Sequence, residues 1–194
     1  FSVDDGHDEE VTAAMFIPKT HIAITGDLDG NIIFWDADTG ELLEELSLHN
    51  GSVLSMDVSP GAERLATGGE DNNVCIVDID DFEEEYCFDT DGYDGVWGVD
   101  FGEDSDTLLA TFGVGADLWD LGNNGADFED FYGDHRLGTY DTAFSPDMEY
   151  VLTGSDDESM ILWDTDSGEQ LLIFEGGTNI ITHSFFMPDG EHVV

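Results

Sequence analysis

The chain has 194 residues, and 40% of them are hydrophobic, which is enough apolar material to form a core. It contains 47 acidic but only 3 basic residues, giving a net charge of −44. Such a surface repels phosphates and anionic lipids, so we exclude nucleic acid from the expected partners. No apolar run reaches the roughly 18 residues of a membrane-spanning helix, so we also expect no membrane insertion.

Short segments of alternating apolar and polar residues follow one another along the whole chain, separated by turns rich in Gly and Asp. This pattern predicts antiparallel β-strands and no helix. In the first part of the chain the expected strands are 11–17, 21–25, 31–36, 41–46, 53–58, 64–67 and 74–78. In the second part they are 96–101, 108–112, 139–144, 150–154, 160–164 and 169–174, and a last group opens at 179–186.

A dipeptide ending in Asp closes one strand of each group. These pairs are separated by 42, 42 and 44 residues: Trp35-Asp36, Val77-Asp78, Trp119-Asp120 and Trp163-Asp164. A period of about 40–45 residues is typical of the four-stranded blades of a β-propeller. The sequence therefore predicts an all-β propeller with four blades and part of a fifth, with repeats at about 7–48, 49–91, 92–134, 135–176 and 177–194. Because propellers protect their edge strands by closing into a ring, we expect a segment of a longer, seven-bladed ring, and a closed ring of four or five blades is the alternative.

A His, a Thr and an Asp recur in three of the blades, with the His and the Asp always 22 residues apart. The carboxylate can accept a hydrogen bond from one imidazole nitrogen, the Thr hydroxyl can contact the other, and a Trp indole N–H can donate to that hydroxyl. A hydrolase triad uses similar groups, but their repetition favours a structural role, because a catalytic site is needed once. The predicted network comprises His7, Thr25, Asp29 and Trp35; His49, Thr67 and Asp71; and His135, Thr153, Asp157 and Trp163.

The succession GH, SPDG, TGSDD and ILWD resembles the WD-repeat β-propeller family over the entire chain. The order of the blades, with the Trp missing from the second, is similar to that of the G-protein β subunit. The resemblance implies a non-catalytic scaffold for several protein partners, with signal transduction as the role that the β subunit suggests. Two departures argue against binding of α and γ subunits: Ser52 stands where an aromatic residue is expected, and this chain contains no coiled-coil helix.

In such propellers the partner usually binds the face where the loops between blades and the loops between the second and third strands emerge. We expect this rim to receive a protein or peptide, with Leu28, Tyr93 and Ile180 as apolar anchors among acidic and polar residues. The alternative is that these are ordinary solvated loop residues. The predicted rim comprises Asp8, Glu10, Leu28, Asn50, Ser52, Glu70, Tyr93, Arg136, Asp156 and Ile180.

The acidic residues are spread through every repeat and are densest at 78–94. One interpretation is adaptation to a salty (halophilic) cytoplasm, since molar salt shortens the screening length to about 3 Å. The other is an acidic docking surface for a basic partner, as in a chaperone of a histone or a ribosomal protein. By analogy with the fourth repeat we expect Cys75 and Cys87 to lie on opposite faces of neighbouring strands as reduced thiols, which favours the cytoplasm.

An enzyme that uses the central channel of the propeller is the remaining alternative. However, no acid, base or nucleophile occurs just once, outside the repeat pattern and next to a second group with which it could act. The Asp-rich turns at 27–31 and 89–92 lack the terminal Glu of a calcium loop. Zinc-ligand spacing and a phosphate-binding Gly loop are also missing from the sequence. We therefore expect no catalytic residue, metal or cofactor.

Overall fold

The computed structural model describes residues 6–122, 126–176 and 179–194. Over these ranges the chain forms four antiparallel sheets of four strands each and no helix, which confirms the predicted all-β propeller fold. The first two sheets contain β1 (Val11–Phe16), β2 (Ile22–Asp27), β3 (Asn31–Asp36) and β4 (Leu42–Ser47), then β5 (Val53–Val58), β6 (Arg64–Gly69), β7 (Asn73–Asp78) and β8 (Glu83–Asp89). The last two contain β9 (Gly98–Phe101), β10 (Thr107–Phe112), β11 (Gly115–Asp120) and β12 (Asp127–Tyr132), then β13 (Thr139–Phe144), β14 (Tyr150–Ser155), β15 (Ser159–Asp164) and β16 (Gln170–Glu175).

In the first, second and fourth blades the repeated Asp at the end of the third strand closes the hairpin that follows it. The Asp36 carboxylate accepts the backbone N–H groups of Asp38 and Thr39 at 3.0 and 2.8 Å. Asp164 accepts from the N–H of Ser167 at 2.9 Å in the same way. An Asp side chain that hydrogen-bonds the backbone just ahead of it is ordinary turn chemistry. In these three blades the Asp of the repeated dipeptide therefore sets the turn between the third and fourth strands.

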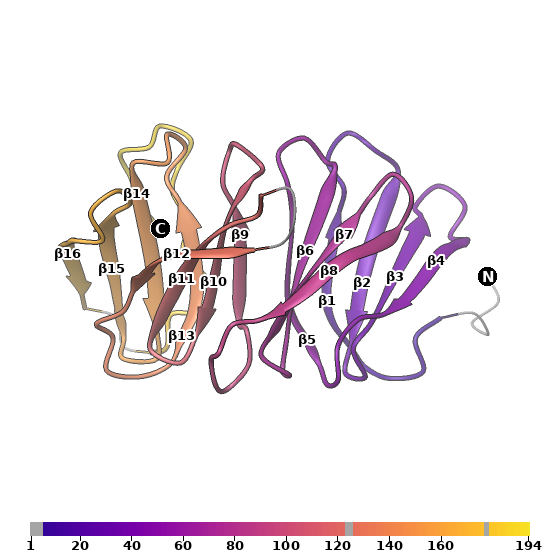
Figure 1. The fold of residues 1–194 in the computed structure, drawn as a ribbon, viewed down its shortest axis with the longest axis horizontal. Coiled ribbons are helices and arrows are strands. Elements are labelled where there is room, and N and C mark those ends of the chain that lie inside the picture. The colour runs from indigo at the N-terminus through magenta and orange to yellow at the C-terminus, as the bar shows by residue number, and fades with distance from the viewer. Residues whose placement is uncertain (1–5, 123–125, 177–178) are drawn as a thin grey trace.

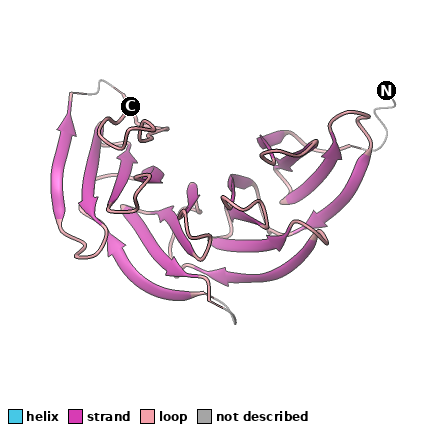
Figure 2. Cartoon of the chain, turned by 90° about the horizontal axis from the view of Figure 1, so that it is seen from above, coloured by secondary structure: helices cyan, strands magenta, loops and turns pink. Residues whose placement is uncertain are grey.

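The four sheets follow one another along an open arc (Figure 1, Figure 2). The first strands of successive sheets, β1, β5, β9 and β13, lie side by side, and they line the inside of the curve (Figure 2). The buried apolar residues form three clusters, and each draws its members from two adjacent sheets. Examples are Phe34 with Leu65, Val74 with Leu108, and Leu109 with Val151. Each core therefore lies between two blades.

Beyond the fourth sheet, residues 179–194 carry one isolated antiparallel bridge, between Phe186 and Val193. This segment contacts the fourth blade through Ile181, whose N–H donates to the Ser155 carbonyl at 3.0 Å. It occupies the position of the predicted fifth blade. In the described part of the chain, no helix is long and apolar enough to cross a membrane.

A carboxylate on the inner strand of one blade binds the backbone of the next blade's inner strand. Asp57 accepts from the N–H of Phe101, and Asp100 accepts from the N–H of Phe144, both at 2.7 Å. Asp141 makes the corresponding bond to the N–H of Ser184. Three partly buried carboxylates thus link consecutive blades along the inside of the arc.

Burial makes ionisation of these carboxylates costly. Burial, together with the nearby Asp57 and Asp141 charges, raises the pKa of Asp100 to about 8, against the effect of the Phe144 N–H. Burial also raises the pKa values of Asp57 and Asp141. The folded chain therefore binds a proton at Asp100 that the unfolded chain has lost at neutral pH.

The expectation of two reduced thiols on opposite faces is wrong, because Cys75 and Cys87 form a disulfide. The two residues are directly opposite each other on β7 and β8. A bulge between Ile76 and Val77 offsets the register by one residue, so that a count from the hairpin turn alone pairs Cys75 with Tyr86. The argument from free thiols to a cytoplasmic location no longer holds.

Replacing Asp100 by Asn is expected to stabilise the fold, and increasingly so as the pH rises. An acid whose pKa is raised by folding contributes stability that declines between its unfolded value of 3.8 and its folded value of about 8. The amide oxygen keeps the bond to Phe144 and does not titrate. Denaturant unfolding at pH 5 and at pH 9 measures the effect. The control is Asp120→Asn, which removes the same charge from an exposed position; an equal gain there at pH 9 would contradict the explanation.

The polar network and the candidate binding rim

The fourth blade contains the full predicted network. His135 Nε2 lies 2.8 Å from the Thr153 hydroxyl, and its Nδ1 lies 3.3 Å from the Asp157 carboxylate. The Trp163 indole N–H donates to the same hydroxyl at 2.9 Å. Although burial alone would raise it, hydrogen bonds from the Arg136 N–H and other donors hold the pKa of Asp157 at about 2. Burial lowers the pKa of His135, so the imidazole is neutral.

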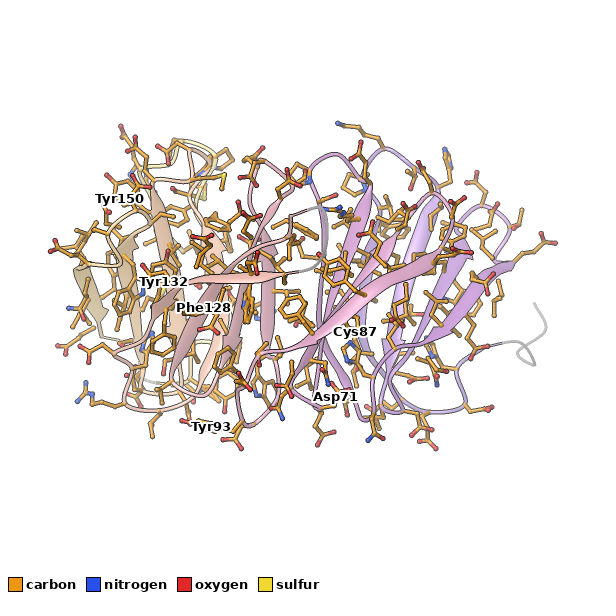
Figure 3. The ribbon with its side chains drawn as sticks, viewed as in Figure 1. Asp71, Cys87, Tyr93, Phe128, Tyr132 and Tyr150 are labelled. Carbon is orange, nitrogen blue, oxygen red and sulfur yellow. A yellow bond between two sulfur atoms is a disulfide. The ribbon has the colours of Figure 1, made fainter. Side chains whose placement is uncertain are left out.

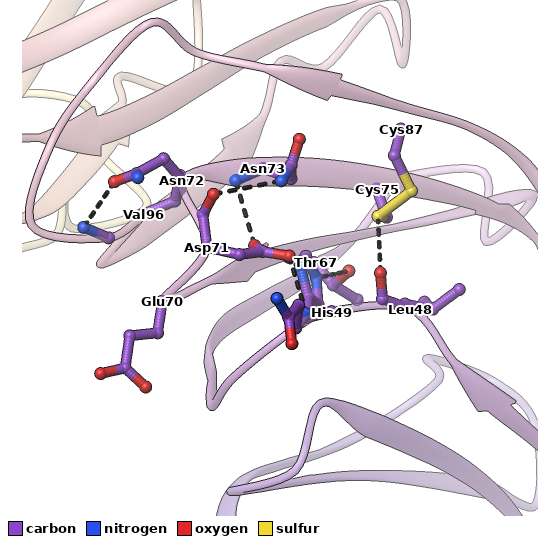
Figure 4. Close-up of polar contacts among 12 residues, drawn as sticks. Leu48, His49, Thr67, Glu70, Asp71, Asn72, Asn73, Cys75, Cys87 and Val96 are labelled. Atoms are coloured by element: carbon purple, nitrogen blue, oxygen red, sulfur yellow. Dashed lines mark hydrogen bonds and ion pairs between the residues drawn. A yellow bond between two sulfur atoms is a disulfide. The ribbon is translucent and has the colours of Figure 1, made fainter.

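The second blade has the same arrangement without the Trp. His49 Nδ1 lies 3.0 Å from Asp71, and His49 Nε2 lies 2.8 Å from the Thr67 hydroxyl (Figure 4). The side chains of His49 and His135 are both 0% exposed. Both nitrogens of each ring are already engaged, and solvent does not reach them. These groups therefore tie a loop to two strands and offer no nucleophile or base to a substrate.

In the first blade the predicted residue Asp29 is replaced by Asp27. His7 Nδ1 lies 2.7 Å from Asp27, and His7 Nε2 lies 2.6 Å from the Thr25 hydroxyl, which also accepts from the Trp35 indole at 2.7 Å. Asp27 is 1% exposed, whereas Asp29 is exposed. The His–Asp separation is therefore 20 residues here and 22 in the other two blades.

The strand residue at the Asp27 position explains this difference. Gly69 is the equivalent residue of the second blade, and a Cβ there would collide with the His49 imidazole. In the first blade the side chain at this place is itself a carboxylate, which bonds the ring directly. Asp27 also accepts from the N–H of Asp29 at 3.0 Å and from that of Asn31 at 2.9 Å. A comparison of spacings alone does not reveal such a substitution.

The third blade lacks the network. Trp119 pairs with Leu108 as Trp163 pairs with Val151, so Ala110 stands where the fourth blade has Thr153. The Trp119 indole N–H is buried and has no hydrogen-bond partner within the described residues. Asp117 faces Ala110 across the strand pair, and burial raises its pKa to about 7. Only packing holds this Trp in place.

The predicted rim residues lie on loops, and most of them are exposed. Asp71 and Tyr93 mark this face at the lower edge of Figure 3. Ser52 and Asp156 are half-buried, and the others are exposed. The structure brings only some of them together: Ser52 and Glu70 line a common cavity, and Tyr93 packs over Gly113, another residue of its wall. Tyr93 itself does not line the cavity, and the other predicted rim residues that line no part of it are Asp8, Glu10, Leu28, Asn50, Arg136, Asp156 and Ile180.

This rim cavity has a volume of about 660 Å³ and lies between the second, third and fourth blades. In addition to Ser52 and Glu70, the residues that line it are Leu54, Asp94, Trp97, Gly113, Gly138 and Tyr140. Trp97 and Tyr140 meet edge to face, with ring centroids 5.1 Å apart. The sequence reasoning missed both aromatic residues because it considered loop positions and not β13, which carries Tyr140, or the residue just before β9, which is Trp97.

The opposite face has a cavity of about 480 Å³ around Arg64. Arg64 forms ion pairs with Glu85 at 3.3 Å and Asp106 at 3.5 Å. The rest of this cavity is lined mostly by carboxylates and small polar residues, with no aromatic side chain. Both cavities are therefore acidic, but only the rim cavity has aromatic rings in its lining. Across 6–122, 126–176 and 179–194, no cluster of three or more His, Cys, Asp or Glu is arranged to hold a metal ion.

Asp27→Ala is expected to destabilise the protein by about 1–3 kcal/mol, because it leaves the buried His7 ring and two backbone N–H groups without their acceptor. Asp29→Ala is the matched variant, and its effect is expected to stay within about 0.5 kcal/mol. Denaturant unfolding of the two variants measures the difference. A larger loss for the Asp29 variant would restore the original assignment.

Trp163→Phe is expected to cost about 1 kcal/mol more than Trp119→Phe. Both substitutions remove part of a buried ring, but only Trp163 donates a hydrogen bond, worth roughly 0.5–1.5 kcal/mol net. Thermal and urea unfolding of the pair provide the comparison. Equal losses would mean that the bond to Thr153 contributes nothing.

Comparison with known proteins agrees with this geometry. The model of the family described as "WD domain, G-beta repeat" matches residues 2–36, 40–78 and 130–164. These matches include the third strands of the first, second and fourth blades, which end in Trp-Asp or Val-Asp, and they leave most of the third blade out.

Similar curated proteins include Autophagy-related protein 16 of Arabidopsis thaliana, 27% identical over 81% of this chain and 23% of that protein. WD repeat-containing protein VIP3 of the same plant is 23% identical over 100% of this chain and 65% of its own length. Human angio-associated migratory cell protein is 26% identical over 88% of this chain and 38% of its length. The chain thus spans less than two thirds of each of these relatives. With more than half of its residues matched by the family model, the chain belongs to the WD domain, G-beta repeat family.

Proposed function

We propose that this chain is a non-catalytic interaction module whose rim binds a protein partner with a basic surface. Membership of a repeat family whose members generally serve as protein scaffolds supports the general role. The observation that carries the finer proposal is the rim cavity, where Trp97 and Tyr140 lie beside the carboxylates of Glu70 and Asp94. Exposed aromatic residues are the usual anchors of protein interfaces.

Charge supports the basic character of the partner. With 47 acidic and 3 basic residues, the chain attracts cationic proteins and repels acidic ones over distances of about 8 Å at physiological salt. Charge by itself does not choose between the two faces, because both cavities are lined by carboxylates. The aromatic rings favour the rim.

A second candidate function is the shielding of a basic client over the whole surface. The distribution of charge favours it, because the outer strands are acidic too. Glu44 and Glu45 on β4 and Glu83, Glu84 and Glu85 on β8 are all exposed. Such a chaperone would contact its client through many carboxylates and would need no defined pocket.

Hydrogen exchange in the presence of a 20-residue peptide of alternating Arg and Gly distinguishes the two functions. Binding at the rim is expected to protect amides at 50–52, 70–72 and 93–97, while the amides at 61–63 and 103–106 on the opposite face stay unchanged. Trp97→Ala is expected to weaken this binding, and Phe16→Ala, which removes an aromatic residue that is 67% exposed on β1, is expected to leave it unchanged.

Two results would contradict rim binding. Uniform protection of both faces that disappears on raising NaCl from 0.15 to 0.5 M would favour the whole-surface chaperone. Protection confined to the loops around Arg64 would place the partner on the opposite face. Either result would leave the fold assignment intact.

A further inference from the structure

The two aromatic residues of the rim cavity belong to a column of equivalent positions. Thr12, Leu54, Trp97, Tyr140 and Thr182 follow each other at intervals of 42, 43, 43 and 42 residues. All five line a second cavity of about 670 Å³, formed by the inner strands on the inside of the arc. Leu54, Trp97 and Tyr140 line both cavities. The aromatic pair therefore lies where the rim cavity meets the second cavity on the inside of the arc.

The Trp97 indole is partly exposed, and its polar atom is already engaged within its own loop. The indole N–H donates to the Asp94 carbonyl at 2.5 Å. Trp97 and Tyr140 are nearly perpendicular, at 80°, and Trp97 is 39% exposed. The face of an aromatic ring carries negative charge density and attracts a cation that stacks on it.

Two carboxylates lie beside these rings. The Glu70 carboxylate is held by the N–H and the hydroxyl of Ser52, each 3.3 Å from its Oε2 atom. Asp94 contributes the second carboxylate to the lining. None of the chain's three basic residues lines the cavity: Lys19, Arg64 and Arg136 all lie elsewhere. The cavity thus has negative charge with no internal cation to neutralise it.

The loop that carries Asp94 is fixed before any ligand binds. Asp94 and Gly95 have φ angles of 71° and 83°, in the left-handed region. The Gly95 N–H donates to the Asn72 side chain at 2.9 Å, and a Cβ on Gly95 would lie 2.7 Å from Leu54 Cδ1. A fixed site loses little conformational entropy on binding.

We propose that this cavity binds the guanidinium group of an arginine side chain in a peptide segment of the partner. The inference rests on the proposed function and names the group that the rim selects. A guanidinium is planar, so it stacks on the Trp97 ring while its N–H groups reach the Glu70 and Asp94 carboxylates. A lysine ammonium is a more strongly hydrated point charge and cannot stack in this way. The aliphatic stem of the bound arginine extends past Tyr140 toward the second cavity, on the inside of the arc.

Three acetylated, amidated pentapeptides, GGRGG, GGKGG and GG-citrulline-GG, test the proposal by NMR titration of the 194-residue chain at 0.15 M NaCl. Citrulline keeps the planar shape of arginine, but a carbonyl oxygen replaces one of its nitrogen donors and the positive charge is lost. We expect the arginine peptide to bind at least tenfold more tightly than the citrulline peptide and about threefold more tightly than the lysine peptide. Equal affinity for arginine and citrulline, or for arginine and lysine, would overturn the proposal.

Variants locate the site. Trp97→Ala and Glu70→Gln are each expected to weaken binding of the arginine peptide by at least fivefold, and Trp97→Phe is expected to retain most of it because the ring face remains. Glu63→Gln, in the acidic cavity of the opposite face, serves as the matched control and is expected to bind as the parent chain does. Loss of binding in the control, or unchanged binding in Trp97→Ala, would contradict the assignment.

The long Arg-Gly peptide separates this proposal from the rim function. If that peptide still protects the rim of the Trp97→Ala variant as it does in the parent chain, the pocket assignment fails and the rim function stands. If the rim of the parent chain is not protected at all, both fail.

Discussion

Apolar packing between neighbouring sheets is the interaction on which this structure depends. All three core clusters lie between two blades, so no sheet of four strands buries its faces alone. Close approach is secured by a glycine on the second strand: a Cβ on Gly26 would lie 2.8 Å from Val53 of the next blade, and one on Gly68 would lie 2.7 Å from Val96. This explains why glycine follows the network Thr. Each large buried side chain contributes about 1.5–3 kcal/mol, more than any single hydrogen bond of the network.

The polar ties within and between blades respond to pH in opposite directions. Burial lowers the pKa of His135 below 6.5, so the stability that depends on its neutral form is lost as the pH falls through that region. Burial raises the pKa of Asp100 to about 8, so the corresponding stability is lost as the pH rises toward that value. The first tie fixes a loop to its own sheet, and the second joins adjacent sheets. A fall in pH therefore first weakens the network inside a blade, and a rise in pH first weakens the bond between adjacent blades.

The fold could be predicted because the repeat occurs four times, and a period of 40–45 residues is typical of the blades of a β-propeller. The errors came from features that a repeat pattern averages out. One residue decides whether Asp27 or Asp29 meets His7, and one bulge decides whether Cys87 faces Cys75. The rim cavity was only half predicted, since Glu70 lies on a loop whereas Trp97 lies just before β9. The signal for the latter was present as a column of residues at intervals of 42–43.

The third blade connects these observations with the proposed function. It has Gly92 where the second and fourth blades have the network His, and its Trp119 has lost its acceptor. The family model also passes over residues 79–129. This same blade supplies Asp94 and Trp97 to the rim cavity. A loop released from the common network is free to take a conformation of its own, and departures from a repeat pattern are expected where a protein binds something specific. Because charge spread over the whole surface cannot select one position, the binding that we propose depends on the loop that differs.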